Sequence, residues 1–199
     1  MKRTDIHYVG FVFMIIMASC DEPEVVQIDD NTFEEIYQQF HGKYQIVQSM
    51  SEQAVDIDGD GRKSTDMLAE IPNLSSTNLA LRIYNRSFTQ LDTIIYLFTQ
   101  AWSEQIISSR DLANDTTLSP AYAIQGATRT FTLNETRDTL RVVQADADGI
   151  DLEQFPLPEE VSVDAVGQIK VVVRKKLFTS DGWQTVKITT LYSRYTMAT

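Results

Sequence analysis

The chain has 199 residues, and its 28 acidic against 17 basic side chains give it a net charge of −11. This charge excludes nucleic acid as a general partner, because nothing offsets the repulsion from phosphate groups. A hydrophobic content of 43% is typical of a globular chain, and the length fits one domain. The single cysteine, Cys20, excludes an internal disulfide framework and a cysteine-rich zinc site.

The first nineteen residues have the layout of a bacterial export signal. Two basic residues precede an apolar run over residues 8–18, which is too short to span a bilayer but suits the hydrophobic region of a signal peptide. The run ends in Met17-Ala18-Ser19-Cys20, which resembles the lipobox that the lipoprotein signal peptidase cuts just before cysteine. We therefore expect a signal peptide at residues 1–19 and a lipid anchor on Cys20 that holds the chain to a bilayer.

Cleavage before Cys20 limits the chemistry of the mature chain. It removes two basic and one acidic side chain, which takes the net charge from −11 to −12, and it leaves His41 as the remaining histidine. Cys–His pairs and histidine-rich metal sites are thereby excluded. Residues 20–31 then form an acidic tether between lipid and domain. These features predict a location in the bacterial cell envelope, on the outer membrane of a Gram-negative bacterium, facing either the periplasm or the cell surface.

A short helix capped by residues 30–32 is predicted over residues 33–40, because its apolar side chains recur at spacings of three and four and Gly42 suits its end. The chain after it is typical of antiparallel β-structure, with β-branched and aromatic runs between turn residues. The last two strands flank Ser180-Asp181-Gly182, which predicts a hairpin. Loops are expected at residues 108–120 and 146–160. The predicted strands start near residue 44 and continue over residues 79–84, 93–98, 121–125, 128–133, 139–144, 168–174 and 186–192.

An Asp/Gly-rich loop after the first strand carries the sharpest local pattern. Carboxylates at its first, third and fifth positions, with Gly61 at the sixth, suit the wrapping of a short loop around Ca²⁺. The pattern resembles an EF-hand loop, but Met67 stands where that loop closes with glutamate. The alternative is a turn whose side chains cap the next segment. A short helix over residues 64–71, capped by Ser64 or Thr65, is predicted to follow the loop. The candidate calcium ligands are Asp56, Asp58, Asp60, Ser64 and Asp66.

The order of these features resembles that of lipocalin-like bacterial lipoproteins. The shared features are the lipobox, the acidic tether, a short helix, a strand opened by Gly42-Lys43-Tyr44, and an Asp/Gly-rich loop that leads to a helix. Tyr44 stands where lipocalins carry tryptophan, and Arg194 is placed to cover its ring as a cation–π lid. The resemblance implies a mostly β domain over residues 32–199, an antiparallel lipocalin-like barrel or sandwich with a ligand cavity.

A barrel of about eight strands holds either one small ligand or a filled core. The sequence therefore predicts a non-enzymatic binder of a small apolar or amphipathic ligand, whose interior should contain an apolar cavity of roughly 300 Å³ or more. The alternative is an accessory interaction module of an envelope complex, with a filled interior and an exposed apolar patch. A small carboxylate-dependent hydrolase is the third hypothesis. The aromatic residues that would line the cavity or fill the core are Tyr96, Phe98, Trp102, Trp183 and Tyr192.

Other chemical motifs are absent from the sequence. It contains no phosphate-binding loop, no dinucleotide fingerprint and no Gly-x-Ser-x-Gly turn for a nucleophile. The basic run Arg174-Lys175-Lys176 is interpreted as the solvated end of a strand, because three charges on so acidic a chain do not make a nucleic-acid site.

Overall fold

The structure, a computed structural model, is mostly β. The residues that it describes are 30–86, 93–107, 120–144 and 149–199. The predicted signal peptide, the lipidation site Cys20 and nearly all of the predicted tether lie outside the described residues. The helices are α1 (Asp30–Phe40), α2 (Met67–Glu70) and the 3₁₀ helix η1 (Leu74–Ser76). The strands are β1 (Gly42–Val55), β2 (Ser64–Asp66), β3 (Asn78–Arg86), β4 (Thr93–Ile106), β5 (Ala121–Leu133), β6 (Leu140–Val143), β7 (Glu160–Val163), β8 (Ile169–Thr179) and β9 (Gly182–Thr196).

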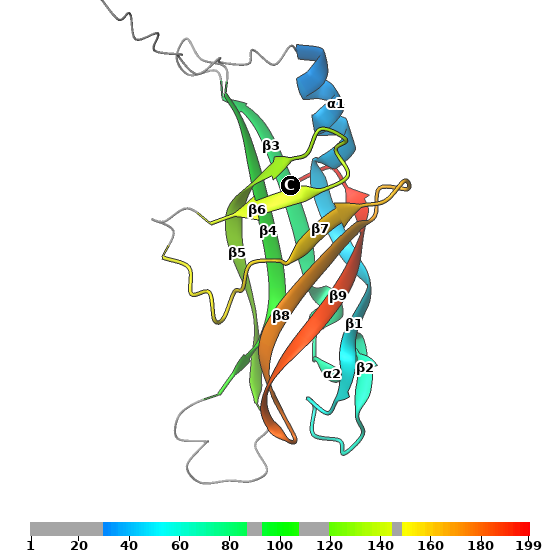
Figure 1. The fold of residues 1–199 in the computed structure, drawn as a ribbon, viewed down its shortest axis with the longest axis vertical. Coiled ribbons are helices and arrows are strands. Elements are labelled where there is room, and N and C mark those ends of the chain that lie inside the picture. The colour runs from blue at the N-terminus through cyan, green and yellow to red at the C-terminus, as the bar shows by residue number, and fades with distance from the viewer. Residues whose placement is uncertain (1–29, 87–92, 108–119, 145–148) are drawn as a thin grey trace, which may run out of the picture.

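The strands form one antiparallel sheet that curls into a nearly closed barrel (Figure 1). Its order is β6-β5-β4-β3-β1-β9-β8-β7, with β2 added beside β1, so that the first and last strands of the chain pair with each other. A bridge between Thr139 and Ser162 joins the two ends of the sheet. The expected mostly β fold, an antiparallel barrel with two short helices, is therefore confirmed.

Helix α1 packs closely against the start of β1. Its apolar face is buried at Ile36 and Phe40, and the hydroxyl of Tyr44 donates to the Phe40 carbonyl oxygen at 2.7 Å. Gly42 has a φ of 145°, and a Cβ at this position would lie 2.5 Å from the carbonyl oxygen of Thr196. Both the backbone conformation and the lack of space therefore require glycine here.

Arg194 has a different role from the one predicted. It lies opposite Tyr44 across β1 and β9, but its guanidinium donates to three carbonyl oxygens at the end of α1, the nearest being Gln38 O at 2.7 Å. The cation–π contacts among the described residues involve two lysines of β8. The predicted cation–π lid over Tyr44 is therefore wrong, because the unpaired carbonyls of the helix end are the better acceptors for this cation.

Several elements differ from prediction in length. The two strands expected at residues 121–125 and 128–133 are one strand, β5, and β4 continues beyond its expected end at residue 98. The extension of β4 carries Gln100 and Glu104, whose polar side chains interrupt the apolar alternation but have partners inside the barrel. Strand β7 follows the expected loop at 146–160, where no strand is predicted.

The helix expected at residues 64–71 is reduced to α2, because β2 takes its first residues. Asp66 caps α2 by accepting from the backbone N–H of Leu68 at 3.0 Å, whereas the Ser64 hydroxyl accepts from Asp66 N at 2.9 Å. The cap is therefore Asp66 and neither Ser64 nor Thr65.

Large side chains fill the barrel interior. The core joins aromatic residues from α1, β1, β4, β5 and β9 with aliphatic residues from β3 and β8. Of the helices in the part of the chain that the structure describes, none is long and apolar enough to cross a bilayer. The largest fully buried side chains are Tyr44, Tyr192, Phe40, Phe98 and Phe131.

Candidate functional site

The barrel wall is incomplete between β5 and β8. β6 pairs with β5 over residues 130–133, and β7 pairs with β8 over residues 169–172. The remaining edges, residues 121–129 of β5 and 173–179 of β8, have no second strand partner among the described residues. We call the space between these two edges the seam, and residues 149–159, which run beside it, the strap (Figure 1).

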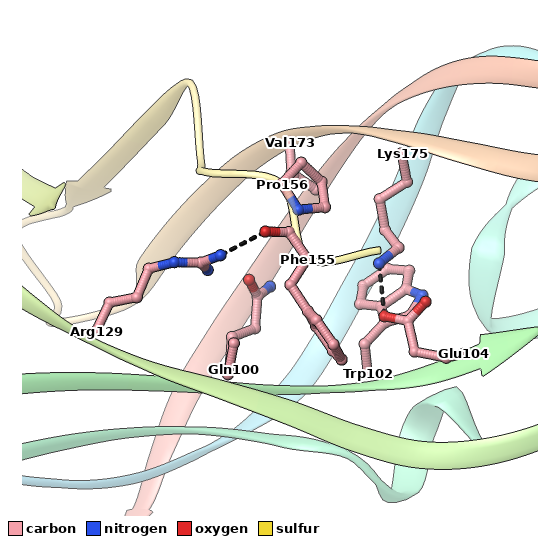
Figure 2. Close-up of a pocket in the computed structure, with 9 residues that line it drawn as sticks. Gln100, Trp102, Glu104, Arg129, Phe155, Pro156, Val173 and Lys175 are labelled. Carbon is pink, nitrogen blue, oxygen red and sulfur yellow. Dashed lines mark hydrogen bonds and ion pairs between the residues drawn. The ribbon is translucent and has the colours of Figure 1, made fainter. Parts of the chain in front are cut away.

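Polar contacts hold the strap over the seam. The guanidinium of Arg129 donates to the carbonyl oxygen of Phe155, as Figure 2 shows. The ammonium of Lys175 donates to the carbonyl oxygen of Gln154 at 3.0 Å. The side-chain amide of Gln154 donates to Gln125 at 2.6 Å, and the backbone N–H of Glu159 donates to β8 at 2.8 Å. The strap is thus fastened mainly by side chains and not by a continuous ladder of backbone hydrogen bonds.

A buried ion pair lies behind the strap. Lys175 Nζ is 2.6 Å from Glu104 Oε1, and the two side chains are only 6% and 7% exposed. The same ammonium is 5.3 Å from the centroid of the Trp102 ring and 6.0 Å from that of Phe155. Burial raises the pKa of Glu104 and lowers the pKa of Lys175, and the opposite charge of each partner counters the shift. Such a pair is costly to bury, which makes its position a candidate for function.

Trp102 adds an unused hydrogen-bond donor to this cluster. The residue is 3% exposed, and its indole Nε1 is buried without a hydrogen-bond acceptor among the described residues. Trp102, the ion pair, Arg129 and Phe155 line a void of about 20 Å³. A void of this size has room for one water-sized group. A buried donor without an acceptor is a position where a bound acceptor atom would be stabilised.

Two larger hollows lie on either side of the strap. One, of about 230 Å³, lies between the strap and the lower part of β8, next to Glu104 and Trp183. The other, of about 460 Å³, lies between the strap and β5 and shares Ala127 and Phe155 with the small void. Both are open to solvent. None of these three hollows is the apolar cavity of roughly 300 Å³ expected inside a binder, and Phe155 lines two of them.

Only some of the predicted ligand-contacting aromatics reach these spaces. Trp102 lines the void, and Trp183 lines the smaller hollow from the outer surface, where it is 46% exposed. Phe98 and Tyr192 are fully buried core residues, and Tyr192 accepts a hydrogen bond from Gln100 at 2.9 Å. Tyr96 packs on Phe131 with ring centroids 5.3 Å apart. A shared aromatic character therefore does not bring these residues to one site.

The prediction that Arg174-Lys175-Lys176 is a solvated strand end is wrong for its central residue. Arg174 and Lys176 form ion pairs on the surface with Glu159 and Glu153 of the strap, whereas Lys175 points into the barrel. The alternation of β8 contains the missed signal. Ile169, Val171 and Val173 face inward, so a strand of period two puts Lys175 on the same face.

The Asp/Gly-rich loop forms a second acidic site. Carboxylate oxygens of Asp56, Asp58 and Glu70 lie within 4.8 Å of one another, and we call these three residues the acidic cluster. Asp56 accepts from the backbone N–H groups of Gly59 at 2.8 Å and Gly61 at 3.2 Å. Glu70 accepts from a backbone N–H of the loop at 2.7 Å, and burial raises its pKa. Two of the predicted calcium ligands are thus brought together with a third carboxylate that the loop pattern does not contain.

The other predicted calcium ligands lie outside the acidic cluster. Asp60 accepts from the backbone N–H of Arg62 at 2.7 Å, while Ser64 and Asp66 make the local bonds at the start of α2. Glu70 comes from the far end of α2, which folds back over the loop, and so it is too distant in sequence for a loop motif to include it.

Comparisons with protein families, with curated proteins and with solved structures find no match for this chain. Its function therefore has to be inferred from the seam and from the acidic cluster.

Proposed function

We propose that the protein is a lipid-anchored lipoprotein of the bacterial envelope whose barrel binds one small amphipathic ligand at the seam, without catalysing a reaction. Cys20 carries the anchor in this proposal, on the strength of the lipobox-like sequence before it. The observation that carries the binding function is the polar cluster of Trp102, Glu104 and Lys175, which is buried behind the strap.

Displacement of the strap would open the seam while the barrel stays intact. The strap contributes backbone carbonyls to Lys175 and Arg129, and any ligand with hydrogen-bond acceptors can take over those bonds. Phe155 occupies the space that an apolar group of a ligand would take, between the small void and the larger hollow. Ligand pockets combine apolar walls with a few polar groups, which is the composition found here.

Mass spectrometry of one preparation tests both halves of this proposal. The full chain is produced in a bacterium, extracted in mild detergent, and measured under denaturing and native conditions. Under denaturing conditions we expect the mass of residues 20–199 plus acyl chains. Under native conditions we expect an additional mass of about a few hundred daltons, the size of a small ligand. An unprocessed chain without acyl groups contradicts the anchor, and an unchanged native mass contradicts binding.

A steric variant connects that added mass to the seam. Ala127 lines both the void and the larger hollow, so Ala127→Phe should abolish the additional mass. Ile124 lies on the same strand but is 54% exposed, and Ile124→Phe should retain it. Circular dichroism establishes that both variants fold.

An accessory interaction module is the second candidate, and the filled interior favours it. Trp183 and Leu152 are about half exposed beside the seam, where a protein partner could cover them. A native mass without an added ligand would favour the interaction module over the ligand binder. The hydrolase hypothesis gains no support from the acidic cluster. Its carboxylates Asp56 and Glu70 accept hydrogen bonds from backbone N–H groups of the loop, which gives them a structural role.

For the acidic cluster we propose Ca²⁺ as a structural ion, and Glu70→Gln tests it. In chelator, the variant should be more stable than the wild type at neutral pH, because burial disfavours the charged form of Glu70 and glutamine still accepts from the loop N–H. In CaCl₂ at about a hundredfold excess over the Kd, the wild type should gain about 2.7 kcal/mol, and the variant should lose most of this gain. Thermal melts in chelator and in CaCl₂ measure both. A wild-type melt that is unchanged by CaCl₂ excludes the ion.

A further inference from the structure

We infer that the ligand of the seam is a short extended peptide, with an aromatic residue between two acidic ones, which binds as an added strand along β8. This inference rests on the binding function proposed above and adds the chemical class of the ligand. Its basis is that the strap already occupies the seam as a segment of peptide, held by contacts that such a ligand would reproduce.

The uncovered edge of β8 offers backbone groups to a further strand. Both backbone groups of Phe178 point away from β9, since they bond to the side chain of Gln105 of β4 at 2.8 Å. Backbone groups of alternate residues point to the same side of a strand, so those of Arg174 and Lys176 also face the seam. Because Gln105 blocks the position of Phe178, residues 173–177 are left for a peptide of about five residues.

The strap does not use this edge as a regular strand would. Among the described residues it makes one backbone hydrogen bond to β8, from Glu159 to Val172. Pro156 and Pro158 have no N–H and so cannot continue a ladder along β8. An extended peptide without proline would therefore form backbone bonds that the strap leaves unmade.

The outer face of the edge selects acidic side chains. Arg174 and Lys176 point outward and pair with two strap carboxylates, Glu159 at 2.5 Å and Glu153 at 2.6 Å. In an added strand, the residues opposite Arg174 and Lys176 are two positions apart and lie on one face. Acidic residues at these two positions would replace the strap carboxylates, whereas basic residues there would meet like charges.

The inner face selects an aromatic residue between the two acidic ones. Phe155 of the strap now takes this place, where it lines the void with Trp102 and Ala127, and its ring centroid is 6.0 Å from the ammonium of Lys175. Arg129 and Lys175, which Figure 2 shows on either side of Phe155, donate to two successive carbonyls of the strap. Donors spread along a chain in this way suit the repeating carbonyls of a peptide backbone.

The strap is thus an internal competitor for the seam. Its two ion pairs are exposed, and exposed ion pairs contribute little to stability. Segments with few backbone hydrogen bonds open at a low cost in free energy. Phe155 is the apolar anchor of the strap, so the strength of this competition depends on its ring.

The experiment measures peptide binding by fluorescence anisotropy. The full chain with its lipid anchor is held in phosphatidylcholine nanodiscs, and empty nanodiscs correct for binding to lipid. The probe is fluorescein-labelled Thr-Glu-Phe-Glu-Thr with an amidated C-terminus. A second peptide carries lysine in place of both glutamates. Two further peptides carry a pair of N-methyl groups, one on the backbone nitrogens of the glutamates and one on those of the threonines.

The peptide series tests charge and strand pairing separately. The probe should bind at least about tenfold tighter than the lysine peptide. N-methylation of the glutamates removes the N–H groups that point to β8 and should weaken binding at least about tenfold. The N–H groups of the threonines point away from β8, so N-methylation there is the matched control and should change binding by about threefold or less.

Two pairs of substitutions test the charges of the edge. Arg174→Gln with Lys176→Gln should reduce the preference for the probe over the lysine peptide to about threefold or less. Lys63→Gln with Lys170→Gln is the matched control, because it removes the same amount of charge from lysines that form ion pairs elsewhere on the surface. It should keep the full preference.

Phe155→Ala tests the competition by the strap. Loss of the half-buried ring weakens the strap, so this variant should bind the probe about tenfold tighter than the wild type. General damage to the seam would weaken binding instead. The peptide series on the wild type decides the proposal if this variant fails to fold.

The peptide assignment and the binding function fail in different ways. Equal binding of the probe and of the peptide methylated at its glutamates would overturn the added strand. If neither the wild type nor Phe155→Ala binds the probe in a saturable way, the peptide assignment is overturned. The native mass of the same preparation then decides the rest, because an additional mass leaves the binding function standing and an unchanged mass overturns both.

Discussion

Gly42→Ala should destabilise the protein by about 3 to 5 kcal/mol, as the sum of backbone strain and steric overlap. The φ of 145° lies in a region that residues with a side chain rarely adopt. The added methyl group would lie 2.5 Å from the backbone oxygen of Thr196 and 3.0 Å from Cδ of Arg194. The overlap therefore forces β9 away from β1, where the barrel closes, and disturbs the side chain that caps α1.

Gly182→Ala is the matched control for this substitution. Gly182 also has a positive φ, 93°, but an added Cβ there meets no atom within 4 Å. Its cost should be the backbone strain alone, about 1 to 2 kcal/mol. Denaturant unfolding of the wild type and both variants measures the difference. Equal losses in the two variants would show that close packing against β9 contributes nothing at Gly42.

Lys175→Met should destabilise the protein by about 3 to 5 kcal/mol at neutral pH, because it leaves the Glu104 carboxylate buried without its partner. Adding Glu104→Gln should recover at least half of this loss, since no charge is then left buried. Lys170→Met removes a partly exposed lysine of the same strand and should cost about 1 kcal/mol or less. Unfolding curves of the three variants provide these values, and a double variant as unstable as Lys175→Met alone would contradict the explanation.

The pH dependence of the stability of Lys175→Met follows from the carboxyl group of Glu104. Burial already raises the pKa of Glu104 above its ordinary value of 4.5, and loss of the ammonium removes the contact that opposes the rise. Above pH 4.5 the folded variant then keeps a proton that the unfolded chain has lost, so its stability falls as the pH rises through that window. The deficit relative to the wild type should accordingly shrink as the pH is lowered towards 5. A deficit that is constant between pH 5 and 8 would contradict this sign.

Strands with regular alternation could be predicted from the sequence, and strands with polar interior residues could be predicted only in part. The hairpin around Ser180-Asp181-Gly182 is present because the buried side chains of β8 and β9 are apolar apart from Lys175, Thr179 and Thr190. The helix ending before Gly42 follows from its periodic apolar residues. The second half of β4 escapes prediction because Gln100 and Glu104 face inward. Their partners, Tyr192 and Lys175, are distant in sequence.

The seam and the acidic cluster also bring together residues that are far apart in the sequence. Lys175 belongs to a basic run, and only its place in the alternation of β8 separates it from its exposed neighbours. Glu70 joins Asp56 and Asp58 because α2 folds back onto the loop, which no local motif specifies. The sequence of the strap, which contains Pro156, predicts only an ordinary loop. Its position over the seam depends on contacts with Arg129 of β5 and Lys175 of β8, which its own sequence does not specify.

The strap also affects the tendency of the protein to aggregate at high concentration. The uncovered edges of β5 and β8 present rows of backbone donors and acceptors, and such edges can pair with another chain and start aggregation. Pro156 and Pro158 have no N–H, so the strap shields these edges without itself offering a regular strand edge. The Gln105 side chain satisfies both backbone groups of Phe178 at 2.8 Å, which blocks one further pairing position. Any displacement of the strap would remove part of this protection, so the open form of the seam should self-associate more readily than the closed form.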